Sequence, residues 1–357
     1  MPSRNFIISN DTSSLSKSRR KRSLLLQHTP RLVLLLLFFF LVPRFFNEYW
    51  LSAILTPFLI LSLAGMGLNL LTGYAGQLSL GSAAFMAIGA YASYNLITRL
   101  PGLSPLVAIV LGGGITALVG VVFGLPSIRI KGFYLIASTL TAQFFVEWLL
   151  TSIPWFSHDD SSGVLSAPNL LLFGWPVASP VTRYLFALGV TVVLFSFCSG
   201  VVRSELGRRW MAVRDMDTAA AIIGIPIIRS KLLAFGISSF VLGIAGSLWA
   251  FTYLGTVEPH GFSLNLSFQI LFIIIIGGMG SIAGSVWGAA FIVLLPILLS
   301  NAASTLAGIG IAVGDLQNIQ HLLFGALIIF FLVKEPDGLA CMMQRARHRL
   351  ASLIRRT

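Results

Sequence analysis

Segment 72–81, which reads TGYAGQLSLG and lies between two apolar runs, is the first candidate for a functional site. Its three glycines, its glutamine and its serine are therefore expected at or near membrane depth. Non-helical backbone is tolerated there only where it is buried in protein or lines a water-filled path. A tight cytoplasmic turn capped by Ser79 is the alternative. The candidates for a polar path are Gly73, Tyr74, Gly76, Gln77, Ser79 and Gly81.

A second candidate is the polar loop 203–231. Asp217 can cap a short helix that starts at Thr218, and Gly224 followed by Pro226 can end it. This alanine-rich helix, flanked by arginines, could enter a groove on a partner protein. An amphipathic connector lying on anionic lipid explains the same residues equally well, so both interpretations stay open.

Two further positions extend the candidate path. Gln143 and Glu147 lie one helical turn apart in an apolar run, and an intramembrane carboxylate indicates function by default. Glu147 is near the predicted external end, however, where it can reach water. Gly277 and Gly280 are included because segment 277–284 weakly repeats the glycine spacing of 73–81, and such repeats mark the two halves of many transporters.

The chain lacks the patterns of common catalytic sites. It has no Gly-x-x-x-x-Gly-Lys-Ser/Thr segment, so it carries no phosphate-binding loop of its own, and neither His-Glu-x-x-His nor Gly-x-Ser-x-Gly occurs. The adjacent residues His158, Asp159 and Asp160 cannot all converge on one ion. Cys198 and Cys341 lie in separate segments, which argues against a disulfide. We therefore predict no catalytic residue, no metal and no cofactor bound by this chain.

Composition indicates a membrane protein. Of the 357 residues, 56% are apolar and only 10% are charged, whereas soluble domains carry about 25% charged residues. The net charge of +12 comes from basic clusters between apolar spans, the pattern of cytoplasmic loops next to lipid. This distribution argues against nucleic acid as a partner, although a basic arm at 17–22 remains the alternative.

The predicted fold is an all-α polytopic bundle of about 8–10 transmembrane helices. With both termini in the cytoplasm, only Arg44, Arg99 and Arg183 of the 24 Lys and Arg residues face outside. The chain is therefore expected to divide into a basic cytoplasmic tail at 1–22, a transmembrane domain at 23–333 with an external loop at 154–180, and a basic cytoplasmic tail at 334–357. Segment 266–300 could be one helix, two spans or a re-entrant pair. The candidate spans are 23–43, 51–71, 77–97, 104–124, 133–153, 181–202, 232–254, 266–282, 284–300 and 316–333.

Several segments in consistent order resemble a known family. Segment 72–81 is followed by Ala84-Phe85 and by Gly89-Ala90-Tyr91. The chain over about residues 50–340 is similar to the LivM-type permease subunits of bacterial branched-chain amino-acid ABC importers. The other segments that carry the resemblance are 125–134, 207–225, 231–235, 243–248, 277–284, 321–325 and 335–339.

The resemblance implies a permease in the bacterial inner membrane rather than an enzyme. It implies a second, homologous permease, two cytoplasmic ATPases that hold ATP and Mg²⁺, and an external binding protein that delivers the amino acid. It also places the helix that couples to the ATPase within 217–224, and loop 203–231 is therefore called the coupling loop below. The residues that it implies for coupling are Gly207, Arg208, Arg214, Asp217, Ala219, Ala220 and Gly224.

The chain departs from the family pattern at three places. The usual Glu-Ala-Ala-x-x-x-Gly sequence appears here as Thr218-Ala219-Ala220 and ends at Gly224. Ser82 follows the glycine of Leu-Ser-Leu-Gly. The external loop has Ser161-Ser162-Gly163 where the family often has Gly-Gly-x-x-Gly-Leu. The last difference leaves urea or a short amide as alternative substrates. An ion-coupled carrier and an integral-membrane enzyme are the rival classes.

Overall fold

The computed structural model describes residues 47–100, 102–130, 132–157 and 175–307 of the 357, with Arg44 and scattered positions in 164–172 and 322–345. The chain divides into two compact units, Met1–Glu48 and Tyr49–Thr357. All of the elements discussed below belong to the second unit.

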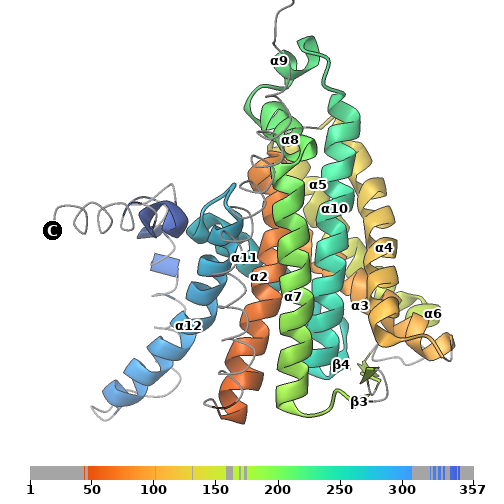
Figure 1. The fold of residues 1–357 in the computed structure, drawn as a ribbon, viewed down its shortest axis with the longest axis vertical. Helices are drawn as coiled ribbons and strands as arrows, with labels where there is room; N and C mark the ends of the chain where they lie inside the picture. The colour runs from red at the N-terminus through yellow and green to blue at the C-terminus, as the bar shows by residue number, and fades with distance from the viewer. Residues whose placement is uncertain are drawn as a thin grey trace, which may run out of the picture. The chain divides into compact units, whose positions relative to one another are not determined.

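Helices make up most of this unit (Figure 1). The long helices are α2 (Thr56–Asn69), α3 (Ser82–Arg99), α4 (Pro105–Gly124), α5 (Phe133–Ser152), α7 (Pro180–Arg203), α10 (Ile227–Leu248), α11 (Leu264–Gly277) and α12 (Ile282–Ala307). The shorter helices are α6 (Pro154–Ser157), α8 (Glu205–Asp215) and α9 (Asp217–Ile222). Wider π turns extend α2 at both ends, as η1 (Trp50–Leu55) and η2 (Leu70–Tyr74), and extend α10 as η4 (Trp249–Leu254). The 3-10 turns are η3 (Leu125–Ile128) and η5 (Pro259–Phe262).

The all-α membrane fold predicted from the sequence is confirmed. In the described part, six helices are long and apolar enough to cross a membrane, and a shorter apolar stretch covers Ile282–Leu298. Helix α3 is not among the six, because serines, Asn95 and Arg99 make it less apolar. Segment 266–300 is divided between α11 and α12. The predicted spans 23–43 and 316–333 lie outside the continuously described residues.

Small residues allow helices α3, α4 and α10 to pack closely. Gly89 of α3 lies directly against Gly243 of α10, and Gly120 of α4 lies against Ser239. At the same contact, Ser247 Oγ is 3.0 Å from the Gly89 carbonyl oxygen and 2.8 Å from Ser93 Oγ. Close backbone approach of this kind drives helix association in lipid. Gly114 of α4, by contrast, faces open space.

Opposite ends of the bundle carry different loops. Helices α8 and α9 lie at one end, and α6, β3 and β4 lie at the other (Figure 1). The end with α8 and α9 holds the basic coupling loop, so it faces the cytoplasm. At the external end, β1 (Leu165–Ser166) pairs antiparallel with β4 (Thr256–Val257), and β2 (Leu171–Leu172) pairs with β3 (Trp175–Pro176).

Candidate translocation segment and coupling loop

The first break, residues 75–81, leads the chain from η2 into α3. The amide N–H of Gln77 donates to the Leu71 oxygen (3.0 Å), and Thr72 Oγ1 donates to the Gln77 oxygen (3.1 Å). Gly76 has φ +70°, which glycine adopts without a steric penalty. The backbone of Gln77 is thus held. Its side-chain amide, in a residue that is 4% exposed, has no hydrogen-bond partner among the described residues.

Helix α3 begins deep inside the protein. The Leu80 N–H donates to Thr139 Oγ1 (3.0 Å), and the Ala84 N–H donates to Gln143 Oε1 (2.7 Å). Thr139 and Gln143 lie six and ten residues after Phe133, the cytoplasmic start of α5, which is roughly 9 and 15 Å along a helix. The end of the first break therefore lies level with Thr139, and the first turn of α3 lies level with the middle of α5. Discontinuous helices are typical of transporter binding sites.

Gln143 joins three elements at the start of α3. Its Nε2 donates to the Phe262 oxygen (2.9 Å), while its Oε1 also accepts from Ser267 Oγ (3.2 Å). Ser267 in turn accepts from the Ala83 N–H (2.9 Å). The side chain is buried and both ends of its amide are occupied, so Gln143 joins α3, η5 and α11. Glu147, one turn further, is half-buried and does not share these contacts.

The second break, residues 278–281, separates α11 from α12 and is bound to α2. Asn69 Nδ2 donates to the Ser281 oxygen (2.9 Å) and to Ser285 Oγ (3.0 Å). The Gly280 N–H donates to Asn69 Oδ1 (2.8 Å). Gly277 and Gly284 lie backbone against backbone, so a side chain at either position would collide with main chain.

The two breaks meet. Gly73, just before the first break, lies against the Gly280 amide, with no room for a Cβ. The two glycine segments that share a spacing in the sequence are therefore side by side in the fold. Of the other candidates, Tyr74 and Ser79 are buried, and Gly81 packs on the Thr139 backbone.

Arg214 connects the coupling loop with the first break. It is the tenth residue of α8, and its Nη1 donates to the Gly73 oxygen (2.7 Å). Its aliphatic stem covers Gly76, where an added Cβ would lie 2.7 Å from the arginine Cγ. Asp215 accepts from Arg214 Nε (2.9 Å) and so orients the guanidinium. A cytoplasmic helix is thereby joined to the entrance of the first break.

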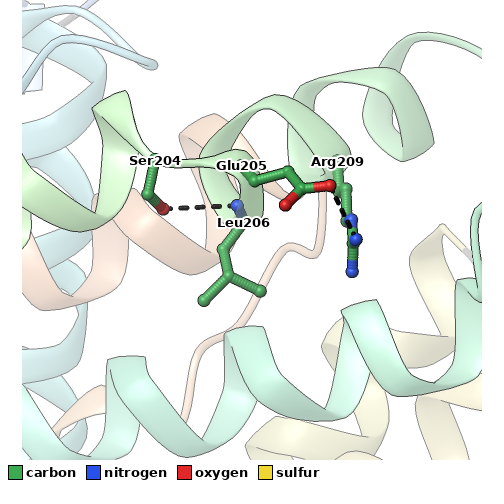
Figure 2. Close-up of polar contacts among 4 residues, drawn as sticks. All are labelled: Ser204, Glu205, Leu206 and Arg209. Carbon is green, nitrogen blue, oxygen red and sulfur yellow. Dashed lines mark hydrogen bonds and ion pairs between the residues drawn. The ribbon is translucent and has the colours of Figure 1, made fainter.

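Helix α8 is held firmly at its base. Ser204 Oγ accepts from the Leu206 N–H (3.2 Å), and Arg209 pairs with Glu205 at 2.8 Å one turn along the helix, as Figure 2 shows. Trp210 is fully buried and donates to the Ser230 oxygen of α10 (2.9 Å). Gly207 lies against the Val202 backbone, and Arg208 Nη1 donates to the Arg203 oxygen (3.4 Å).

Helix α9 forms the tip of the coupling loop. It begins at Asp217, one residue before the predicted start, and Gly224 ends it with φ +85°. The Ile225 N–H donates to the Ala220 oxygen (3.0 Å) and the Gly224 N–H to the Ala221 oxygen (3.0 Å), which is a Schellman motif. Ala220 is buried and Ala219 is exposed. Ile222 and Ile223 are 87% and 73% exposed, so the tip presents an apolar patch.

Comparison with known proteins assigns the family. The family described as "Branched-chain amino acid transport system / permease component" matches residues 50–332. The chain belongs to this family. It is 30% identical to the high-affinity branched-chain amino acid transport system permease proteins LivM of Salmonella typhimurium and Escherichia coli, over 81% of this chain and 69% of each relative. It is 25% identical to the fructose import permease protein FrcC of Rhizobium meliloti, over 70% of each chain. No solved structure matches.

Membership of this family establishes the general function of the chain. The chain is a membrane permease subunit of an ABC importer and a multi-pass protein of the bacterial inner membrane, and it is not an enzyme. An ATPase and a substrate-binding protein are the general partners of such permeases. The rival classes, an ion-coupled carrier and an enzyme, are not favoured. That this permease itself binds no cofactor stays a prediction.

Several functional contacts were absent from the sequence interpretation. The main omission is α8 as a helix in its own right, although its buried apolar positions, Gly207, Trp210 and Val213, recur at helical spacing. Asn69, Thr139 and Ser267 were also missed. Each is a lone polar residue in an apolar run, and that signal could have drawn attention to it.

Proposed function

We propose that this permease forms the translocation path for branched-chain or similar aliphatic amino acids. In this proposal it pairs with a second, homologous permease and with two cytoplasmic ATPases, and an external protein delivers the substrate. The family and the two LivM relatives support the substrate class. The fructose relative shows that distant similarity extends to importers of another solute.

The observation that carries the proposal is the hydrogen bond from Arg214 to the Gly73 oxygen (2.7 Å). It runs from α8, on the side where the ATPase would bind, to Gly73, which lies two residues before the start of the first break. Trp210 anchors the middle of α8 on α10, so motion of the tip would turn α8 and move Arg214. In our proposal, ATP binding on the partner chains acts through this contact to reorient the first break.

The tip of the coupling loop supplies the surface for the ATPase. Ile222 and Ile223 are exposed, lie next to the exposed Ala219, and are held rigidly by the Schellman motif. Exposed apolar side chains on a short helix suit a hydrophobic groove on a partner. Arg208 and Asp217 lie on the same loop and would contribute charge at its rim. Ala220, which is buried, instead fixes α9 onto the protein.

The path itself would pass the first break. Gly73, Tyr74, Gly76, Gln77, Ser79 and Gly81 remain its candidates, with Gly277 and Gly280 at the adjoining break. Gln143 is assigned to hold the start of α3, because both polar atoms of its amide already have partners. Glu147 stays a candidate for the external half.

The test is recovery of the complex followed by a transport assay. The tagged chain is purified from detergent-solubilised membranes, and the bound proteins are identified. The complex is then placed in proteoliposomes, and uptake of labelled L-leucine is measured with ATP and the external binding protein. We expect an ATPase, a second permease and ATP-dependent uptake.

A matched pair of variants tests the tip. Ile222→Asp should reduce recovery of the ATPase at least fivefold without changing the amount of folded permease. The control must lie outside the membrane-spanning helices, because a charge at an exposed position such as Leu118 of α4 would face lipid. Thr218→Asp, an exposed position on the same helix as Ile222, should have less than a twofold effect. Recovery of a single chain without an ATPase, or uptake independent of ATP, would contradict the proposal.

A further inference from the structure

A cavity lies where the first break meets the coupling loop. Its volume is about 360 Å³, within the range of about 300–1,000 Å³ found for small-molecule sites. Gly76 and Gln77 of the first break, Met216 between α8 and α9, and the start of α5 contribute to its wall. The cavity is therefore on the cytoplasmic side, next to the point where a transported solute would leave the first break.

The wall of this cavity contains charged, apolar and amide side chains. Arg214 and Lys231 bring positive charge, while Asp215 and Asp217 bring the same amount of negative charge. The charged groups therefore sum to zero, which suits a ligand that is neutral overall and carries both signs. A free amino acid is such a zwitterion, whereas a metal ion or a phosphate would meet as much repulsion as attraction.

The rest of the wall is apolar or amide. Ile130, Leu135 and Val213 line the cavity between the charged groups and could contact a small aliphatic side chain. Gln77 also lines it, and the oxygen and nitrogen of its buried amide have no hydrogen-bond partner in the described part of the chain. A buried amide without partners is unfavourable unless another group satisfies it. The other two large cavities are lined almost entirely by apolar side chains.

We propose that this cavity is an exit site that binds the zwitterionic aliphatic amino acid after it has passed the first break. This rests on the proposed function for the substrate class. The ammonium and carboxylate groups would meet the charges of opposite sign, the Gln77 amide would bond to either group, and the aliphatic side chain would lie on Ile130, Leu135 and Val213. Because Arg214 and Met216 flank the site, an occupied cavity would also oppose movement of α8 against α9.

Protection of an introduced cysteine tests the site. Cys198→Ala and Cys341→Ser remove the two native thiols, and Met216→Cys adds one at a position that is 63% exposed and lines the cavity. Inside-out membrane vesicles that contain the whole complex are treated with a membrane-impermeant maleimide. L-leucine should slow labelling at least fivefold. The probes 4-methylpentanoate and 3-methylbutylamine, which each lack one charge, should slow it less than twofold.

Two variants make the result specific. Gln77→Leu should abolish most of the protection by L-leucine. Leu125→Cys, exposed near the same membrane face but outside the cavity wall, should label at the same rate with and without L-leucine.

Three outcomes would overturn the exit site. They are no protection by L-leucine, equal protection of Leu125→Cys, or equal protection by the amine or the acid. ATP-dependent leucine uptake is measured on the same proteins. Leucine uptake without protection of the cysteine would contradict the exit site and leave the proposed function intact. If neither uptake nor protection is observed, the exit site and the proposed function are both contradicted.

Discussion

The two helix breaks differ in what holds them, although they share a glycine spacing and touch at Gly73 and Gly280. The second break is closed by main chain and by the three hydrogen bonds of Asn69. The first break is covered by a long, flexible side chain, Arg214, and borders a polar cavity. From this comparison we predict that the second break is a fixed anchor and that the first break is the part that moves.

The largest effect is expected from a side chain at the second break. Gly277→Val would push a Cβ into the Gly284 backbone, which cannot move aside as a side chain could. Overpacking of this kind typically costs about 1–3 kcal/mol and occasionally more, so less folded permease should be recovered and its Tm should fall by several degrees. Gly114→Val, where the added side chain meets open space, is the control and should keep its Tm. Equal Tm values for the two variants would mean that the second break is not an anchor.

Removal of the Arg214 side chain should separate ATP hydrolysis from transport. Arg214→Ala loses the bond to the Gly73 oxygen and uncovers Gly76. We expect leucine transported per ATP hydrolysed to fall about tenfold, the range found for residues that carry coupling, with little change in Tm. Arg209→Ala, which removes only an exposed ion pair with Glu205, should stay within twofold. A normal transport ratio in Arg214→Ala would refute the distinction between the two breaks.

Asn69→Ala should weaken the anchor without uncoupling the transporter. It leaves the Gly280 N–H without its acceptor and removes both donations to α12 and its break. A lost buried partner costs about 1–3 kcal/mol, so thermal unfolding should shift by a few degrees while the transport-to-ATP ratio is unchanged. Asn95→Ala, which breaks only a bond to Tyr91 within α3, should shift Tm less. A changed ratio in Asn69→Ala would show that the second break also moves.

The smallest effect is expected at the end of α9. Gly224 has φ +85° with open space around it, so Gly224→Ala adds backbone strain of about 1 kcal/mol and no collision. The amides of α9 should exchange with solvent a few times faster, while ATPase recovery stays within twofold. Gly189→Ala, in the ordinary helical backbone of α7, should leave exchange in α9 unchanged. Unchanged exchange in Gly224→Ala would show that the Schellman motif does not stabilise the tip.

Periodicity and composition were sufficient for the helices, because lipid requires about 20 apolar residues per span and leaves few alternatives. The role of glycine in packing, at Gly89 or Gly243, also follows from residue type alone. The contacts that hold the two breaks cannot be predicted from residue type. Asn69 reaches Ser281 across 212 residues and Arg214 reaches Gly73 across 141. A single sequence carries no signal for such pairs. Gln143 illustrates the limit, since its polarity indicated importance but not that its partners would be the backbones of α3 and η5.

The start of α3 has a consequence for synthesis of the protein. Its first amides bond to Gln143 and to Ser267, and the latter follows Ala83 by 184 residues. A nascent α3 leaves the ribosome long before Ser267 has been translated, and lipid cannot accept hydrogen bonds from its exposed N–H groups. This helix is also too polar to match the six apolar spans. The Ala83 amide therefore gains its side-chain acceptor only after α11 has been translated, so the contacts that fix the start of α3 are completed late in synthesis.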